Sequence, residues 1–161
     1  MSNKLIIMRG CPGSGKSTIA KKLYENYAKE GYESCFWLST DNFWMTDDDP
    51  PQYKFDASKL GHAHTNTFAI FCTVAGEAFG TKGPRLIILD NTNTQWKEFS
   101  HYVAVAKKLG FVVEQLMPDT EWAFNAEELF KRNLHNVPLE TIKAMIGRFE
   151  SYESIESRLG Q

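Results

Sequence analysis

The sequence contains little cysteine and no long apolar run. Its three cysteines, among 161 residues, form no C-x-x-C pair, which argues against a disulfide framework, a zinc site or a redox motif. The apolar run before Arg9 has only four residues, too few for a signal-peptide core or a membrane span. We therefore expect a cytoplasmic protein that has no membrane contact.

An excess of positive charge is also missing. Lysine and arginine together number 18, aspartate and glutamate 20, and the net charge is −2. This balance argues against a protein that coats nucleic acid by charge alone, although it is compatible with a local basic groove. The sequence has no low-complexity tract or internal repeat, and 42% of its residues are hydrophobic. These features predict one globular domain that spans residues 1–161.

Short apolar runs alternate with helical patterns along the chain. The runs predict buried parallel strands over 4–9, 34–39, 85–90 and 111–117. Helical periodicity predicts helices over 17–30, 57–80, 96–109 and 122–134, and one from Pro138 to the end. The intervening residues 42–56 have no regular pattern. Because consecutive parallel strands need crossover helices, this alternation predicts an α/β fold.

Two of the predicted helices have an apolar stripe. In the helix over 57–80, the stripe consists of Leu60, His64, Phe68, Phe71, Cys72, Ala75 and Phe79. In the last helix, it consists of Leu139, Ile142, Met145, Ile146, Phe149 and Ile155. Since such stripes pack against a sheet or against other helices, we expect a three-layer architecture with helices on both faces of the sheet.

The sequence GCPGSGKST matches the phosphate-binding P-loop G-x-x-x-x-G-K-[ST] and lies between a predicted strand and a predicted helix. Its residues are expected to bind the nucleotide: Gly10, Cys11, Pro12, Gly13, Ser14, Gly15, Lys16, Ser17 and Thr18. The glycines let backbone N–H groups and a helix N-terminus converge on phosphate oxygens. Lys16 is expected to neutralise the β- and γ-phosphates, Ser17 to bind Mg²⁺ and Thr18 to reach the α-phosphate.

The motif therefore predicts ATP and Mg²⁺ as cofactors. It also predicts a P-loop NTPase or kinase fold, a three-layer αβα domain whose small parallel sheet has about four or five strands. The P-loop fixes the phosphate donor but not the acceptor, because motors, switches and kinases share it.

Asp41 follows the second predicted strand, at the edge where an α/β sheet presents ligand-binding groups beside the P-loop. A carboxylate at this place can take the proton of an attacking hydroxyl and hold its oxygen in line with the γ-phosphate. Asp41 is therefore a candidate general base. The alternative is that its side chain only caps a turn.

Four segments occur in order along the chain: GCPGSGKST, TD-x-F after the second strand, LDNTN after the third, and KRN-x-H-x-VP before the last helix. As an ordered set they resemble phage-type 5′-hydroxyl polynucleotide kinase domains and related small P-loop kinases. The resemblance spans nearly the whole chain. It implies transfer of the γ-phosphate of ATP to the 5′-hydroxyl of DNA or RNA, with Asp41 as the general base.

The segment LDNTN ends the third predicted strand with a carboxylate, which is typical of a magnesium-orienting element in P-loop enzymes. Asp90 is the candidate metal residue. In the phage enzymes the aspartate of this motif lies one position later, which corresponds to Asn91. The functional residue after the third strand is therefore either Asp90 or Asn91. Asn91 and Asn93 are candidates for binding the acceptor, or they form an Asx turn.

Arg132, in KRN, falls at the end of the helix that resembles the lid of this family. The chain has only five arginines, and a phosphoryl-transfer enzyme usually places one against the developing charge. Arg132 is therefore a candidate for nucleotide binding and catalysis, with a helix-capping cation as the alternative. His135 either contacts the adenine of ATP or only packs against neighbouring side chains.

The chain departs from the phage enzymes at two positions. Trp44 and Asn136 stand where those enzymes carry arginines, so two cations for a polyanionic acceptor are missing. The segment from Phe43 to Asp56 instead contains Phe43, Trp44, Tyr53 and Phe55. These rings either stack on acceptor bases or form a hydrophobic clamp; Phe43 and Trp44 are the acceptor-binding candidates.

Three functions follow. The first is a kinase that acts on a nucleic-acid hydroxyl, most simply a 5′-end. The second is a kinase of a nucleoside, a modified base or another small hydroxyl compound. The third is an ATP-binding switch or adaptor with weak hydrolysis. The sequence does not distinguish DNA from RNA or ATP from GTP, and it gives no oligomeric state.

Overall fold

The computed structural model describes residues 1–76 and 82–161. Its centre is a parallel sheet of four strands in the order β2-β3-β1-β4. The strands are β1 (Lys4–Met8), β2 (Ser34–Leu38), β3 (Arg85–Asp90) and β4 (Val112–Leu116). Their register places Ile6 opposite Ile88 and Glu114. The four predicted strands are therefore confirmed, with bounds that differ by at most one residue at either end.

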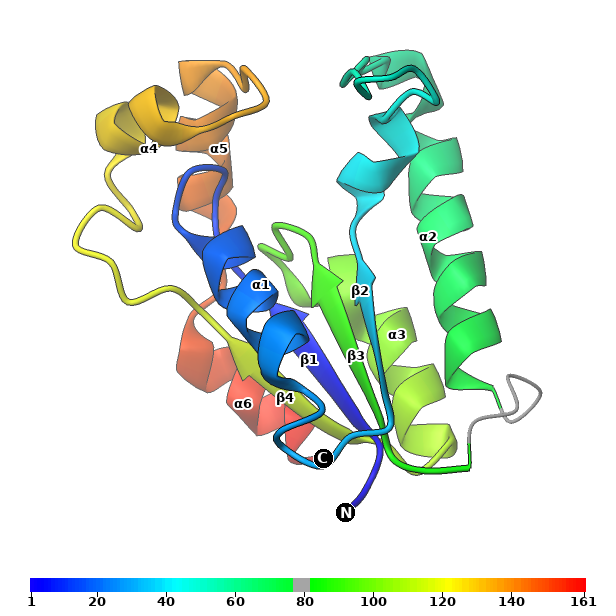
Figure 1. Cartoon of the computed structure of the whole chain (residues 1–161). Helices are drawn as coiled ribbons and strands as arrows, with labels where there is room; N and C mark the ends of the chain where they lie inside the picture. The colour runs from blue at the N-terminus through cyan, green and yellow to red at the C-terminus, as the bar shows by residue number, and fades with distance from the viewer. Residues whose placement is uncertain (77–81) are drawn as a thin grey trace.

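Helices cover both faces of the sheet (Figure 1). Because side chains alternate along a strand, Ile6 and Met8 face α1 (Lys16–Asn26), and Leu5 and Ile7 face the opposite side. The second face packs against α2 (Leu60–Ala75), α3 (Trp96–Lys108) and α6 (Tyr152–Leu159). This arrangement is the predicted three-layer αβα architecture. No helix in the described part of the chain is long and apolar enough to cross a membrane.

Two groups of elements lie beyond the carboxyl ends of the strands, at the top of Figure 1. One consists of α4 (Ala126–Arg132) and α5 (Leu139–Arg148), which share a small core of Cys11, Leu129 and Ile142. The other consists of the 3₁₀ helices η1 (Thr40–Trp44) and η2 (Ala57–Lys59) and the residues between them. The carboxyl edge of the sheet, where the P-loop begins, therefore lies between these two groups.

The prediction of one helix from Pro138 to the end is wrong. The chain forms two helices, α5 and α6, separated at residues 149–151. The side chain of Ser151 accepts a hydrogen bond from the backbone N–H of Ser154 and starts α6 as its N-cap. In the same way Asn125 caps α4, which begins four residues later than predicted because this cap lies inside the predicted helix.

The predicted stripe of α2 is only partly correct. Phe71 and Ala75 are buried, but Leu60 is 41% exposed, and His64 and Cys72 also face outward. The buried positions are instead Ala63, Thr67, Phe71, Val74 and Ala75. Small residues at 63 and 67 let the helix approach η1, so the contact face is shifted toward them. Phe79 lies outside the described residues.

Arg9 is a buried charge that sequence patterns do not single out. Its guanidinium donates hydrogen bonds to the carbonyls of Asn93 at 2.9 Å and Glu150 at 2.7 Å and to Oε1 of Gln115 at 2.9 Å. Burial lowers the pKa of Arg9 to about 10, so the group stays charged at neutral pH. It joins strand β4 to the segments that follow β3 and α5.

Candidate functional site

The P-loop connects β1 to α1 and passes beneath α4. Gly13 and Gly15 have φ angles of 82° and 97°, a conformation that glycine adopts without strain. A Cβ atom at Gly13 would lie 2.6 Å from the carbonyl oxygen of Leu129, so α4 packs directly on the loop. The Ser14 hydroxyl is buried and has no hydrogen-bonding partner among the described residues. These features suit a loop whose polar groups bind phosphate oxygens.

Lys16 and Asp90 form a largely buried ion pair. The Nζ atom of Lys16 lies 2.9 Å from Oδ1 of Asp90, while Nε1 of Trp37 donates a hydrogen bond to Oδ2 at 3.0 Å. Asn91 instead accepts a hydrogen bond from the Thr40 backbone at 2.8 Å. In this structure, therefore, Asp90 faces the P-loop and Asn91 faces η1.

Ser17 and Asp90 line one pocket of about 260 Å³, together with Trp37, Ser39, Asp41, Asn42, Met45 and His135. Among residues 1–76 and 82–161, no group of three or more His, Cys, Asp or Glu side chains could hold a metal ion by itself. Mg²⁺ commonly takes one or two protein oxygens and completes its shell with phosphates and water. One hydroxyl and one carboxylate beside the P-loop fit this pattern. Thr18 is exposed next to Ser17.

Asp41 lies on the other side of this pocket. It belongs to η1, whose side-chain cap is Ser39: the Ser39 hydroxyl accepts a hydrogen bond from the Asp41 backbone. The Asp41 carboxylate is thus not used as a cap. Its Oδ1 accepts a hydrogen bond from the Tyr53 hydroxyl at 3.1 Å, and its Oδ2 lies 3.5 Å from Nε2 of His135.

Residues 122–138, here called the lid segment, touch the P-loop through Trp122. The indole N–H of Trp122 donates a hydrogen bond to the carbonyl of Gly13 at 3.1 Å, and the guanidinium of Arg132 lies 3.8 Å from the Trp122 ring centre. Arg132 is about half exposed and pairs with Glu128 at 3.5 Å. It is therefore held near the phosphate loop by an aromatic face.

The other arginines serve different contacts. Arg9 and Arg85 are buried and bond to backbone carbonyls. Arg148 donates to Thr94 and Arg158 pairs with Glu150. Arg132, in contrast, is partly exposed and packs on the Trp122 ring, which bonds to Gly13 of the P-loop. His135 packs on Tyr53, with ring centres 4.3 Å apart.

The structure does not bring all predicted acceptor-binding residues to the pocket. Asn93 is 3% exposed and donates a hydrogen bond to the Met8 carbonyl at 2.8 Å. Trp44 is 4% exposed and makes edge contacts with Phe43 and Phe55. Neither side chain is available at the surface for stacking. Phe43, in contrast, is 37% exposed.

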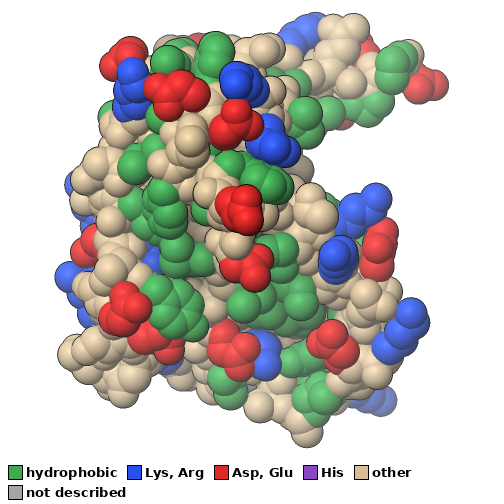
Figure 2. Space-filling model, turned by 90° about the vertical axis from the view of Figure 1, so that its left-hand side faces the viewer, with side chains coloured by type: hydrophobic (Ala, Val, Ile, Leu, Met, Phe, Trp, Pro, Cys, Tyr) green, Lys and Arg blue, Asp and Glu red, His purple; other side chains and the backbone are tan. Residues whose placement is uncertain are grey.

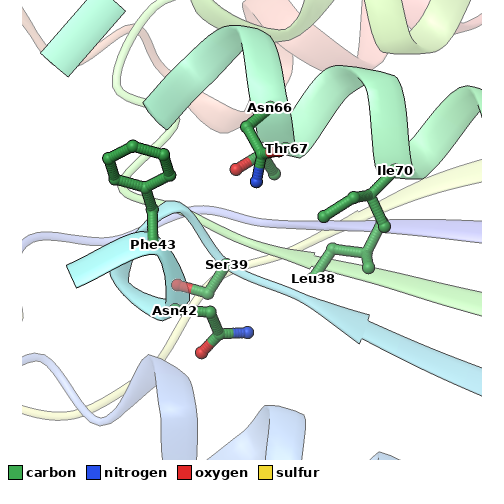
Figure 3. Close-up of a pocket in the computed structure, with 7 residues that line it drawn as sticks. All are labelled: Leu38, Ser39, Asn42, Phe43, Asn66, Thr67 and Ile70. Atoms are coloured by element: carbon green, nitrogen blue, oxygen red, sulfur yellow. The ribbon is translucent and has the colours of Figure 1, made fainter. Parts of the chain in front are cut away.

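A second, smaller pocket of about 130 Å³ lies on the α2 side of η1. Figure 3 shows its lining: Leu38 and Ile70 form an apolar part, and the ring of Phe43 and the amides of Asn42 and Asn66 lie around it with Ser39 and Thr67. Ser39 and Asn42 also line the larger pocket. The two pockets therefore adjoin on either side of η1.

Sequence reasoning missed Trp37 and Trp122. Both were indistinguishable from core aromatics, and their roles depend on an N–H group that meets Asp90 or Gly13 across the fold. A polar donor on an otherwise apolar residue is a weak signal.

Burial raises the pKa of Cys11 in the P-loop to about 11, so this thiol is protonated at neutral pH.

Comparisons with known proteins agree with this architecture. Human NEDD4-binding protein 2 is 39% identical over 152 residues, a match that covers 94% of this chain but only 8% of that protein. Kti12 of Chaetomium thermophilum, solved with ADP-AlF3, has 21% identity, a TM-score of 0.60, and coverage of 91% of this chain and 80% of its own. The APS kinase CysC of Mycobacterium tuberculosis, solved with AMPPNP and APS, has 17% identity and a TM-score of 0.55. This match covers 92% of this chain and 77% of the CysC chain.

The two solved structures show that the fold is that of small P-loop proteins, among them kinases. The family model described as AAA domain matches residues 5–152, a range that contains the P-loop, Asp41, Asp90 and the lid segment. The chain therefore belongs to the AAA domain family.

Proposed function

We propose that this domain is an ATP- and Mg²⁺-dependent kinase that phosphorylates a hydroxyl of nucleic acid, most simply the 5′-hydroxyl of a polynucleotide. The observation that carries the proposal is that Ser17, Asp90 and Asp41 line one pocket. Phosphate-binding groups and a carboxylate outside the P-loop thus face the same space. A switch that only binds or slowly hydrolyses ATP needs no such carboxylate for an acceptor.

Bound ATP supplies the γ-phosphoryl group. The acceptor oxygen forms a bond to the γ-phosphorus as the bond from that phosphorus to the β–γ bridging oxygen breaks, and ADP leaves. Asp41 takes the proton of the acceptor hydroxyl. Lys16 and Arg132 place positive charge near the transferred group. Ser17 and Asp90 would hold Mg²⁺, which would neutralise charge on the phosphates.

Two observations support a nucleic-acid acceptor. The first is the ordered set of motifs that resembles phage-type polynucleotide kinases, with Asp41 at the position of the base. The second is the smaller pocket of Figure 3, because an exposed aromatic ring and two amides without hydrogen-bonding partners among the described residues suit a nucleobase. Because this smaller pocket adjoins the pocket that contains Asp41, a terminal base bound there would lie beside the reacting hydroxyl.

A second candidate is a kinase of a small hydroxyl compound, and the charge distribution favours it. The positions of two arginines in phage enzymes are taken by buried Trp44 and by Asn136. Figure 2 shows acidic and basic side chains intermixed on the face that it presents, rather than one broad basic surface. The lack of a broad basic surface costs a polyanionic strand more binding free energy than it costs a nucleoside-sized acceptor, which has few or no phosphates to neutralise.

Transfer of labelled γ-phosphate tests the proposal. A 5′-hydroxyl oligonucleotide, a nucleoside and adenosine 5′-phosphosulfate are offered at equal concentration to the wild type and to Asp41→Asn. We expect labelled oligonucleotide with the wild type and a loss of at least about 100-fold with Asp41→Asn, while ATP binding persists. Labelling of a small acceptor instead favours the second candidate. ATP binding without any labelled product favours the switch and overturns the proposal.

A further inference from the structure

Three side chains from separate segments meet at one carboxylate. Asp41 comes from η1, Tyr53 from the residues that follow it, and His135 from the lid segment. The Tyr53 hydroxyl donates to Oδ1 of Asp41 at 3.1 Å, and Nε2 of His135 lies 3.5 Å from Oδ2. The two rings also pack on each other. Each carboxylate oxygen therefore has a neighbour from a different part of the chain.

Residues 43–56, here called the aromatic arm, place Tyr53 at this position. Trp44 is buried, and its ring centre lies 5.0 Å from that of Phe55. The backbone N–H of Lys54 donates to the carbonyl of Trp44 at 2.8 Å, and Met45 and Tyr53 form an antiparallel bridge. The buried tryptophan thus fixes the returning strand of the arm, and the pairing sets which side chain faces Asp41.

The lid segment presents His135 from the opposite side. Asn133 accepts a hydrogen bond from the Val137 backbone at 2.8 Å, and Asn136 has a φ of 52°. These two asparagines turn the chain back around His135. Through Arg132 and Trp122 the same segment contacts the P-loop at Gly13. His135 therefore links the acceptor side of the pocket to the nucleotide side.

We infer that Tyr53 and His135 are positioning residues for Asp41, and that they align its carboxylate from the aromatic arm and from the lid segment. This inference rests on the proposed role of Asp41 as the general base. An ionised carboxylate accepts about four hydrogen bonds, so an acceptor hydroxyl can bind Oδ2 while Tyr53 holds Oδ1. Without the Tyr53 hydroxyl, the carboxylate loses the contact that fixes its rotation.

Kinetics of substituted proteins test the inference. Tyr53→Phe keeps the ring contact with His135 and removes only the hydroxyl; we expect kcat to fall about 10- to 100-fold with little change in the KM for ATP. Tyr152→Phe, at an exposed tyrosine on α6, is the matched control and should keep wild-type kinetics. His135→Ala should also lower kcat, and His135→Gln, which retains a side-chain N–H, should recover part of it.

A double substitution separates positioning from general damage. Because Tyr53 acts through Asp41, Tyr53→Phe should cost nothing further in an Asp41→Asn background. Equal losses in both backgrounds would show that Tyr53 acts elsewhere and would overturn the inference.

A measurement that needs no acceptor keeps this inference distinct from the proposed function. Burial, the negative charge of Asp41 and the hydrogen bond to it raise the pKa of Tyr53 above its usual value. Asp41→Asn should therefore lower the pKa of Tyr53, as followed by NMR of protein labelled with ¹³C in the tyrosine rings. An unchanged Tyr53 pKa overturns the positioning contact and leaves the base intact. Wild-type transfer by Asp41→Asn overturns the base and, with it, the positioning role.

Discussion

The ammonium group of Lys16 lies 2.9 Å from Oδ1 of Asp90, with both side chains largely buried. One comes from the P-loop and the other from the end of β3. The residue expected to neutralise phosphate is thus paired with the residue expected to orient Mg²⁺. We therefore expect nucleotide binding and Mg²⁺ binding to be coupled through this ion pair.

Lys16→Ala should abolish this coupling. We expect transfer to fall by at least about 100-fold, because positive charge is lost where charge develops. The free energy of unfolding should fall by about 3 kcal/mol, since Asp90 stays buried without its cation. Transfer of labelled γ-phosphate and urea unfolding measure these two effects, and ATP titration measures the nucleotide affinity. Lys22→Ala, at an exposed position of the same helix, is the control; wild-type nucleotide affinity in Lys16→Ala would contradict the assignment.

Trp37→Phe should weaken Mg²⁺ binding without unfolding the domain. The substitution keeps an aromatic ring but removes the N–H that donates to Oδ2 of Asp90 at 3.0 Å. Groups that orient a metal-binding carboxylate typically contribute about 10- to 100-fold in metal affinity. The Mg²⁺ concentration for half-maximal transfer should rise by about 10-fold. An unchanged Mg²⁺ profile would separate Trp37 from the metal site.

Gly13→Ala should disturb the contact between the P-loop and α4. A Cβ atom there meets the Leu129 carbonyl at 2.6 Å, and the φ of 82° is strained for alanine. We expect a loss of about 1 to 3 kcal/mol in unfolding free energy together with weaker ATP binding. The matched control is Gly147→Ala in α5, where nothing lies within 4 Å; it should stabilise the protein by about 0.5 to 1 kcal/mol. Equal effects of the two substitutions would refute the packing argument.

Stability should fall at alkaline pH in a way that depends on Cys11. Burial raises the pKa of this thiol from 9.0 to about 11, so between these values the unfolded chain ionises while the folded chain keeps the proton. The unfolded state then binds fewer protons, and stability declines as pH rises from about 9 to about 11. The decline is about 2 to 3 kcal/mol. Cys11→Ala should show a shallower alkaline loss in urea titrations at pH 8 and pH 10.5, and parallel curves for the two proteins would contradict this origin.

The sequence predicts those elements correctly whose structure depends on local residue patterns. Strands β1 and β3 are unbroken apolar runs, and the P-loop follows one of them, so their places could be predicted within a residue. The break between α5 and α6 was missed because the apolar stripe continues through Phe149 and Ile155, which masks the cap at Ser151. Periodicity shows which side chains are apolar, but not where a helix ends.

The site was predictable in part for a similar reason. Lys16 and Ser17 follow the loop after β1, Asp90 is the last residue of β3, and parallel strands bring these ends together. Tyr53 and His135 are separated by more than 80 residues, and only the folding of the aromatic arm and the lid segment brings them to one carboxylate. Trp44 appeared suited to stacking on a base, yet its burial makes it the anchor of the arm.

The contact of α4 with Gly13 also limits how this protein can be recombined with its relatives. The lid segment contacts the P-loop backbone at two points. The Leu129 carbonyl occupies the space that a Cβ atom of residue 13 would need, and the indole N–H of Trp122 donates a hydrogen bond to the Gly13 carbonyl. A chimera that joins this P-loop to a foreign lid would lack the tryptophan donor or introduce a clash. The two segments, more than 100 residues apart, therefore have to be exchanged as one unit.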